Sequence, residues 1–268
     1  MTKKILLYGI NFSLLHRLVL GAECWLMRRF DVVSTISQRM HQRLLDKGVL
    51  ADKARLAVNW VDMAQFALPS LDGVAAYRRE LGIADGAVVA LYSGNMGGKQ
   101  GLELLADVAR LMQEQEPSIC FVFCGNGAGR ADLVARCQGL SNVRFIDLQP
   151  LARLPDLLAT ADIHLLPQRA DAADLVMPSK LTGMLASARP VVATAHPGTE
   201  LANVVQACGL VVPPENPAAF SDALKLLAAD PVLCERLGAA GFLYAQENLD
   251  RDAVLAKFEA DLQRVVLG

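Results

Sequence analysis

From residue 87 to residue 229, short apolar runs rich in β-forming residues alternate regularly with segments of helical period. The runs lie at residues 88–93, 118–125, 143–147, 163–167, 190–195 and 210–212. After each run, apolar residues recur every three or four positions, as on one face of a helix. Strands that alternate with helices form βαβ units, in which the strands are parallel. The sequence therefore predicts an α/β fold, a doubly wound parallel (Rossmann-like) sheet covered by helices on both faces.

The first 86 residues follow a different pattern, in which short apolar segments are separated by polar ones. Three short strands are predicted, at residues 4–8, 30–37 and 55–60. An unusually apolar helix is predicted over residues 14–30. Ser37 is a typical N-cap for the next helix, which Gly48 ends. The polar stretch over residues 61–86 predicts a connection between two units.

The composition is that of a folded protein, since 53% of the 268 residues are hydrophobic and 20% are charged. A formal net charge of −2 argues against nucleic-acid binding. Six cysteines show neither paired nor Cys/His ligand spacing, so we expect buried thiols, a cytoplasmic location and no metal site. Lys3 and Lys4 before an apolar run resemble a secretory signal, but Asn11, His16 and Arg17 interrupt that run.

A glycine-rich loop at residues 94–101 joins the run at 88–93 to a helical segment. Exposed N–H groups and the dipole of a following helix both favour a bound phosphate. Lys99 adds a positive charge to this loop. The loop therefore predicts an anion site, and the alternative is an ordinary strand-to-helix turn whose glycines serve backbone geometry.

Three further segments follow other predicted strands, and the carboxyl ends of parallel strands lie at one edge of the sheet. The loop at residues 124–130 contains Gly125, Asn126 and Gly127, but no acidic residue stands where a dinucleotide site needs one. Close approach to a phosphorylated ligand and a purely structural role both remain open for this loop. Leu148 and Gln149, after residues 143–147, could meet the edge of a base.

The third segment precedes a predicted helix over residues 178–188. Pro178 suits a first helical turn, where Ser179 and Lys180 would bring a hydroxyl and a cation together. The alternative is that these residues only cap the helix. Asp174 could bind a sugar hydroxyl or be a solvated loop acid.

These motifs occur together with others, in a fixed order, at residues 58–66, 91–103, 121–130, 142–150, 161–168, 175–194 and 208–224. In that order they resemble the retaining GT-B glycosyltransferases of family 4, and within them the colanic acid and exopolysaccharide branch. The resemblance implies a donor-binding domain at residues 86–247, the C-terminal half of a GT-B fold, followed by a C-terminal helix at residues 248–268.

The resemblance implies that Gly94, Asn95, Lys99 and Gln100 lie at the donor diphosphate. Asn95 stands where most relatives have an arginine, and Lys99 falls one residue short of the usual lysine. Ser179 and Lys180 are assigned to the same diphosphate. The predicted nucleotide and sugar contacts are Gly125, Asn126, Gly127, Leu148, Gln149, Asp174, Pro178 and Leu181.

Two departures from the family pattern concern acidic residues and length. Two glutamates that the family carries eight residues apart fall at Leu175 and Gly183, so the second has no substitute while Asp174 lies beside the first. Only some sixteen residues separate Ser13 from Phe30, where a family member has several strands and helices. Residues 1–85 therefore resemble a shortened remnant of the acceptor domain with its linker, and no histidine matches the family's position near the reaction centre.

The resemblance implies a retaining glycosyltransferase that moves a sugar from a nucleotide-diphospho-sugar to a polysaccharide or lipid-linked oligosaccharide acceptor. No cofactor is implied, because the nucleotide-sugar is a substrate. The alternative function is a non-catalytic nucleotide-sugar-binding remnant or partner subunit. A GT-B-fold epimerase is disfavoured because its acid/base carboxylates and histidines are not evident.

The apolar helix at residues 14–30 also carries Arg17, Arg28 and Arg29. It predicts either self-association, or binding of a partner chain, through residues 1–60, or peripheral contact with the inner face of the cytoplasmic membrane. The alternative is that the helix simply covers the remaining strands.

Overall fold

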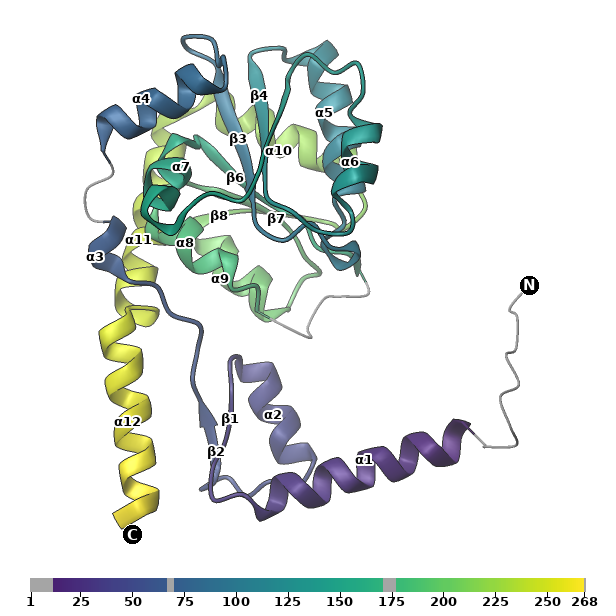
Figure 1. The fold of residues 1–268 in the computed structure, drawn as a ribbon, viewed down its shortest axis with the longest axis vertical. Helices are drawn as coiled ribbons and strands as arrows, with labels where there is room; N and C mark the ends of the chain where they lie inside the picture. The colour runs from purple at the N-terminus through teal and green to yellow at the C-terminus, as the bar shows by residue number, and fades with distance from the viewer. Residues whose placement is uncertain (1–11, 67–69, 171–176, 268) are drawn as a thin grey trace. The chain divides into compact units, whose positions relative to one another are not determined.

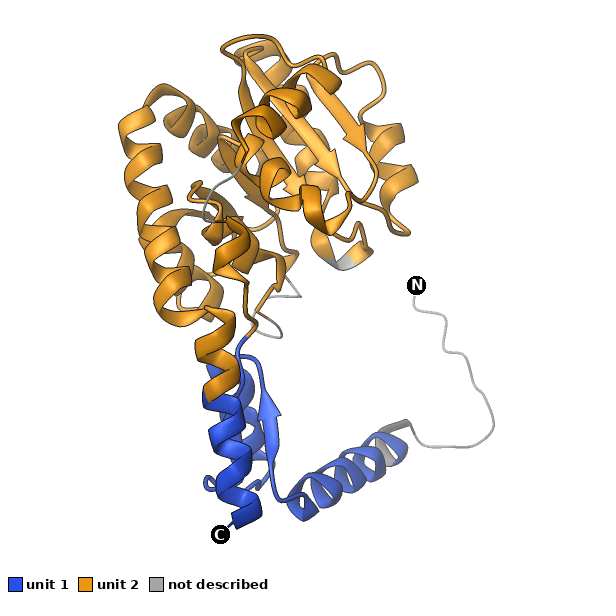
Figure 2. Cartoon of the chain, turned by 60° about the vertical axis from the view of Figure 1, so that its left-hand side comes forward, with its two compact units in different colours: residues 1–58, 257–268 blue, residues 59–256 orange. Residues whose placement is uncertain are grey.

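The computed structural model describes residues 12–66, 70–170 and 177–267 (Figure 1). It divides into two compact units, residues 1–58 with 257–268 and residues 59–256 (Figure 2). The strand predicted at residues 4–8 lies outside the described residues. The domain boundaries predicted after residues 85 and 247 stay predictions, and the compact units divide the chain at other positions.

The larger unit contains a parallel sheet with six strands in the described part of the chain. The strands are β3 (Val88–Ser93), β4 (Ile119–Cys124), β5 (Val143–Ile146), β6 (Ile163–Leu166), β7 (Val191–Thr194) and β8 (Gly209–Val212). Their order in the sheet is β5-β4-β3-β6-β7-β8, and every neighbouring pair is parallel. This order confirms the doubly wound sheet predicted from the sequence.

Helices cover both faces because alternate strand residues point to opposite sides of the sheet. In β3, Val89 and Leu91 belong to one core cluster, and Ala90 and Tyr92 belong to the other. The first cluster is completed mainly by α4 (Leu71–Glu80), α7 (Leu154–Thr160), α8 (Lys180–Ala186) and α9 (Glu200–Cys208). The second is completed mainly by α5 (Glu103–Gln115), α6 (Arg130–Arg136) and α10 (Pro217–Ala229). Figure 1 shows α5, α6 and α10 grouped apart from α7, α8 and α9.

Shorter and later elements complete the chain. They are α3 (Met63–Phe66), the 3₁₀ turns η1 (Gly98–Gln100) and η2 (Leu151–Arg153), α11 (Pro231–Asn248) and α12 (Arg251–Leu267). The predicted helix at residues 178–188 is shorter in the structure, because Pro178 and Ser179 form a turn before α8 begins at Lys180. None of the described helices is long and apolar enough to cross a membrane.

The strand order reverses between β3 and β6, which are neighbours in the sheet. From β3 the chain continues to β4 on one side, and from β6 it continues to β7 on the other side. The loops that leave the carboxyl ends of two such strands diverge and leave a crevice, where doubly wound sheets bind their ligands. The loop at residues 94–101 and the segment that leads to Lys180 both leave this point.

The smaller unit contains α1 (Phe12–Arg29), β1 (Val33–Thr35), α2 (Gln38–Asp46) and β2 (Ala54–Leu56). The two strands pair in parallel. As predicted, Ser37 caps α2, since its hydroxyl accepts a hydrogen bond of 3.2 Å from the Met40 N–H. Leu44, Val49 and Ala54 form a small buried core.

Candidate functional site

The glycine loops after β3 and β4 are bound to each other by backbone hydrogen bonds. The Gly94 N–H donates to the Cys124 carbonyl at 3.0 Å, and the Met96 N–H donates to the Asn126 carbonyl at 2.9 Å. The Met96 carbonyl in turn accepts from the Gly129 N–H at 2.7 Å. The two loops therefore form one rigid rim at the edge of the sheet, as the parallel topology led us to expect.

Glycines at two positions of this rim are required by close packing. At Gly125 the backbone has φ +140°, and a Cβ there would lie 1.9 Å from the Gly94 carbonyl oxygen. At Gly127 φ is +148°, and a Cβ would lie 2.6 Å from the Met96 carbonyl oxygen. The contact between the loops accounts for both glycines, which is the structural interpretation that the sequence left open.

Gly94 has a different function in the rim. Its N–H is already bonded to Cys124 and so is not free to hold a phosphate. A Cβ at Gly94 would lie 3.6 Å from both Cε and Nζ of Lys180. That distance is an ordinary van der Waals contact, so the Lys180 side chain lies against the loop at Gly94, and the φ of +142° is what favours glycine here.

Lys180 reaches from the start of α8 to the end of β3. Its Nζ donates a hydrogen bond of 2.8 Å to the Tyr92 hydroxyl and lies 4.1 Å from the centre of the Tyr92 ring. The Tyr92 hydroxyl donates in turn to the Asn95 carbonyl at 2.6 Å. This chain of contacts crosses the point where the strand order reverses.

The Lys180 ammonium has no counter-ion within the described residues, where the Tyr92 hydroxyl is its one hydrogen-bond partner. Burial lowers the pKa of Lys180 to about 8. Burial also raises the pKa of Tyr92, so that side chain stays a neutral phenol. A partly buried cation without a counter-ion can bind an anion strongly, because water screens the attraction less than at an open surface.

The other residues predicted at the diphosphate lie along the same loop. Asn95 is exposed, and Gln100 is partly buried. The Gln100 Oε1 atom lies 3.0 Å from where a Cβ at Gly97 would stand, so this amide folds back over the loop. Lys99 belongs to η1, and its side chain lies outside the described part of the structure.

Leu148 and Gln149, which were predicted to contact the base of the nucleotide, differ in whether their side chains are free to do so. The Leu148 side chain is 65% exposed. The Gln149 amide donates to the Asp147 carbonyl at 2.8 Å and accepts from the Tyr77 hydroxyl at 3.1 Å. The Asp147 carboxylate pairs with Arg130 at 3.0 Å. Gln149 and Arg130 therefore hold the turn in place, and the turn presents Leu148.

The remaining predicted residues lie around the start of α8. Ser179 is exposed, and Pro178 is partly buried. Leu181 is only 2% exposed and packs in the core, and its N–H donates to the Pro178 carbonyl at 3.0 Å. Its side chain therefore serves packing. Asp174 lies outside the described residues.

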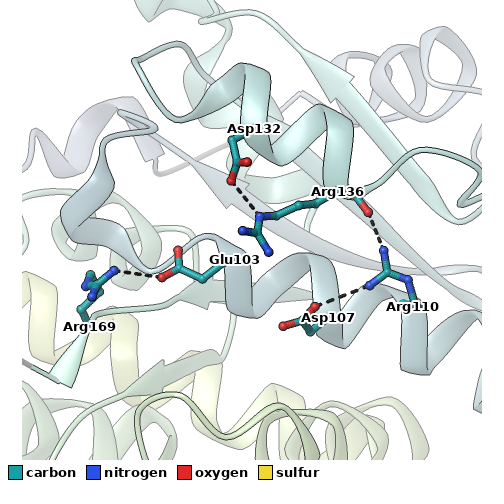
Figure 3. A network of polar contacts seen from close by, with 6 residues as sticks. All are labelled: Glu103, Asp107, Arg110, Asp132, Arg136 and Arg169. Carbon is teal, nitrogen blue, oxygen red and sulfur yellow. Dashed lines mark hydrogen bonds and ion pairs between the residues drawn. The ribbon is translucent and has the colours of Figure 1, made fainter. Parts of the chain in front are cut away.

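Polar contacts join α5 to the segment that follows β6 and to α6 (Figure 3). Arg169, three residues after β6, pairs with Glu103 in the first turn of α5 at 3.1 Å. The Arg110 guanidinium on α5 contacts Asp107 at 3.5 Å and donates to the Arg136 carbonyl on α6 at 2.6 Å. Arg169 and Glu103 also line a small pocket of about 110 Å³ beside Gly101.

Sequence reasoning missed Tyr92 and Arg169 at this edge. Tyr92 is part of an apolar strand pattern, and nothing in that pattern shows that its hydroxyl reaches the rim. Arg169 is a charged residue close to the end of a predicted strand, and this position could have indicated that it lies at the edge of the sheet. Within the described residues, no group of three or more His, Cys, Asp or Glu side chains could hold a metal ion.

A second pocket, of about 420 Å³, lies at the opposite edge of the sheet. Val88, Ile163 and Pro190 line it, and these residues stand at or just before the starts of β3, β6 and β7. Neither glycine loop lines this second pocket. We therefore place the candidate site at the carboxyl edge, where the loops and Lys180 meet.

The fold and the site define a doubly wound α/β unit with a partly buried lysine at its topological switch point, a lysine that has no counter-ion among the described residues. The family model described as glycosyl transferases group 1 matches residues 87–230. This chain belongs to that family.

Individual relatives agree with this assignment. The chain is 34% identical over 240 residues to WcaI of Escherichia coli K12, which is named as a colanic acid biosynthesis glycosyl transferase. It is 27% identical over 240 residues to a D-inositol 3-phosphate glycosyltransferase of Kribbella flavida. These matches cover 88% and 85% of this chain but 58% and 55% of the relatives. The chain thus spans less than two thirds of their length.

Solved structures show the same fold. The Anabaena protein Alr3699/HepE, in complex with UDP and glucose, superposes with a TM-score of 0.75 at 19% identity. The match covers 91% of this chain and 66% of that protein. A sucrose-phosphate synthase of Thermosynechococcus elongatus gives a TM-score of 0.75 at 20% identity, with 97% and 65% covered. These likenesses confirm the predicted GT-B half.

Proposed function

We propose that the larger unit binds a nucleotide-diphospho-sugar at the carboxyl edge of β3 and β6, with the diphosphate beside Lys180. The observation that carries this proposal is the Lys180 ammonium, which is partly buried and has no carboxylate partner in the described structure. A diphosphate would supply the missing negative charge. Its oxygens would accept hydrogen bonds from the Lys180 N–H groups that do not bind the Tyr92 hydroxyl.

The other predicted residues surround that point in the proposal. Gly94, Asn95, Lys99, Gln100 and Ser179 form the wall at the diphosphate. The turn at Leu148 follows β5, the neighbour of β4 in the sheet, and is assigned to the base of the nucleotide. Gln149 supports this turn. The loop at residues 124–130, which follows β4, carries Gly125, Asn126 and Gly127. Asp174 and Pro178 are assigned to the sugar, and Leu181, whose side chain is buried, anchors their segment in the core.

We infer that the reaction is a retaining sugar transfer to a saccharide or lipid-linked acceptor. The bond between the sugar and the diphosphate breaks, a bond to the acceptor oxygen forms, and the proton of the acceptor hydroxyl passes to the leaving diphosphate. Lys180 would stabilise the negative charge that the leaving diphosphate gains. Sugar transfer from a nucleotide-sugar is supported by two similar proteins, since WcaI is named for colanic acid biosynthesis and the HepE complex contains UDP.

A second candidate is a nucleotide-sugar-binding protein that does not catalyse transfer alone. It is favoured by the share of WcaI that the chain spans, 58%, because acceptor positioning contributes a large part of a transfer barrier. A transfer assay with labelled nucleotide-sugars separates the two functions. Binding with neither transfer nor sugar release supports the second candidate, and acceptor-dependent transfer refutes it.

We also propose that α1 contacts the cytoplasmic membrane surface. Glu23 on one face of α1 pairs with Lys47, and Met27 packs against the small core. Other positions expose large apolar side chains, namely Leu15, Leu18, Val19, Trp25, Leu26 and the adjacent Phe30. Residues 12–58 contain eight Lys or Arg and four Asp or Glu, in a chain of net charge −2. This surplus of positive charge favours an anionic lipid surface.

Isothermal titration calorimetry with UDP and with GDP tests the donor site. We expect one of the two nucleotides to bind, and Lys180→Met to weaken that binding about tenfold or more, because a charged hydrogen bond to phosphate is lost. Lys225→Met is the matched control, since Lys225 pairs with Asp222 on the surface of α10. If neither nucleotide binds the folded protein, or Lys180→Met binds as tightly as wild type, the donor site is refuted.

A further inference from the structure

Tyr92 combines a fully buried ring with a hydroxyl that reaches the site. The ring packs on the α5 side of the sheet, in a cluster where Phe121 and Phe123 fill similar positions without a hydroxyl. Packing therefore accounts for the ring and leaves the hydroxyl unexplained. That hydroxyl donates to the Asn95 carbonyl at 2.6 Å and accepts from Lys180 Nζ at 2.8 Å.

These two hydrogen bonds fix the Lys180 ammonium. A lysine side chain is long and flexible, so a free one loses much conformational freedom when it binds an anion. Here the Asn95 carbonyl directs the phenol O–H, and the phenol oxygen then accepts one of the three ammonium N–H groups. The ammonium is held beside Gly94, and within the described structure its other two N–H groups have no hydrogen-bond partner.

We propose that Tyr92 is a positioning residue for the donor: its hydroxyl holds the Lys180 ammonium where the diphosphate binds. The inference rests on the proposed donor site and adds the residue that prepares that site. Tyr92 acts through Lys180.

The same contact affects the charge of Lys180. The group that faces the ammonium from β3 is the Tyr92 phenol, which is neutral, and the 94–101 loop contributes Gly94, which has no side chain. Burial is the cause that lowers the pKa of Lys180, to about 8. A hydrogen bond accepted from the ammonium favours its charged form. Removing the phenol oxygen should therefore lower the pKa of Lys180 further.

Calorimetry with UDP and GDP on Tyr92→Phe measures this effect, because the variant keeps the ring and loses only the hydroxyl. At pH 7.5 we expect the nucleotide that binds wild type to bind Tyr92→Phe about tenfold more weakly. The matched control is Tyr244→Phe, since the Tyr244 side chain packs against the other core cluster and its hydroxyl has no hydrogen-bond partner in the described structure.

Two further measurements separate positioning from a general structural effect. Wild-type affinity should fall as pH rises above 8, and in Tyr92→Phe the fall should begin at lower pH. In a Lys180→Met background, Tyr92→Phe should cause no further loss of affinity, because its effect passes through that lysine.

These experiments distinguish a failure of the Tyr92 role from a failure of the proposed donor site. If wild type binds neither nucleotide, the donor site itself is refuted. If wild type binds and Tyr92→Phe matches it in affinity and pH profile, the role of Tyr92 is overturned. Should Tyr92→Phe fail to fold, a crystal structure of wild type with bound nucleotide in which Lys180 Nζ no longer contacts the Tyr92 hydroxyl also overturns the inference.

Discussion

Individual buried residues explain features of this fold that are unrelated to the ligand. His164 lies inside β6 with no exposed surface, and its Nε2 is 2.8 Å from the Ser187 hydroxyl. Burial, with a smaller contribution from Arg189, lowers the pKa of His164 to about 3. The imidazole is therefore neutral at physiological pH. A buried neutral histidine of this kind serves the core, which agrees with the absence of a family match at His164.

The pKa of His164 predicts a dependence of stability on pH. In the unfolded chain the imidazole regains an ordinary pKa near 6.5, so the unfolded state binds the proton more tightly. The stabilisation is complete above about pH 6.5 and is lost as the pH falls toward 3. Between pH 7 and pH 5 we expect this residue to lower the free energy of unfolding by about 2 kcal/mol.

Urea denaturation at pH 7, 6 and 5 measures this change. His164→Gln keeps a polar group near Ser187 and should have a flatter dependence of stability on pH, even if it is less stable at pH 7. His196→Gln is the control, because His196 is exposed. If His164→Gln keeps the full wild-type dependence of stability on pH, the imidazole of His164 does not cause it.

A second residue-scale prediction concerns Gly125. In Gly125→Ala the new Cβ would lie 1.9 Å from the Gly94 carbonyl oxygen, and the two loops would have to separate. We expect a loss of about 3 kcal/mol of unfolding free energy. Gly139→Ala is the matched control, since Gly139 also has a positive φ, +83°, but has open space around it. We expect it to lower the free energy of unfolding by about 1 kcal/mol. Equal costs in thermal or urea denaturation would show that contact between the loops is unimportant.

At the scale of elements, the spacing of hydrophobic residues along the sequence predicted the strands and helices well, because that spacing determines which side chains are buried. The β3 run alternates between the two core clusters, and Ser37 and Gly48 bound α2 as their cap chemistry requires. The start of α8 was predicted two residues too early, because Pro178 and Ser179 favour a helix start but equally suit the turn found here. Contacts between elements, such as Lys180 with Tyr92, have no signature in local pattern.

The surface of α1 carries the element-scale prediction. We expect the protein to sediment with vesicles that contain phosphatidylglycerol and to bind phosphatidylcholine vesicles weakly. Replacing Leu18 and Trp25 by Glu should reduce vesicle binding at least about tenfold, because two exposed apolar side chains are lost. Leu71→Glu is the control, since Leu71 is 86% exposed on α4.

Two results would contradict a lipid surface for α1. One is vesicle binding that the Leu18 and Trp25 replacements leave unchanged. The other is a wild-type dimer in sedimentation velocity that the same replacements dissociate, which would assign the surface of α1 to a second copy of the chain.

At the scale of the whole molecule, the sheet order is the property that sets the site. Because the order reverses between β3 and β6, one edge of the sheet gathers both glycine loops and Lys180. Sequence order and the family motifs were sufficient to predict this edge. They could not show that Gly94 has its N–H occupied or that Leu181 is buried, since both depend on how separate loops pack.

In this proposal the carboxyl edge of the sheet binds the diphosphate of a nucleotide-sugar through Lys180. A crystal structure of the full chain soaked with UDP or GDP would locate the nucleotide. We predict a diphosphate oxygen within about 3 Å of Lys180 Nζ, beside Gly94 and opposite the Tyr92 hydroxyl. A nucleotide bound instead in the pocket at Val88 and Pro190, or an empty carboxyl edge at saturating nucleotide, would contradict donor binding at Lys180.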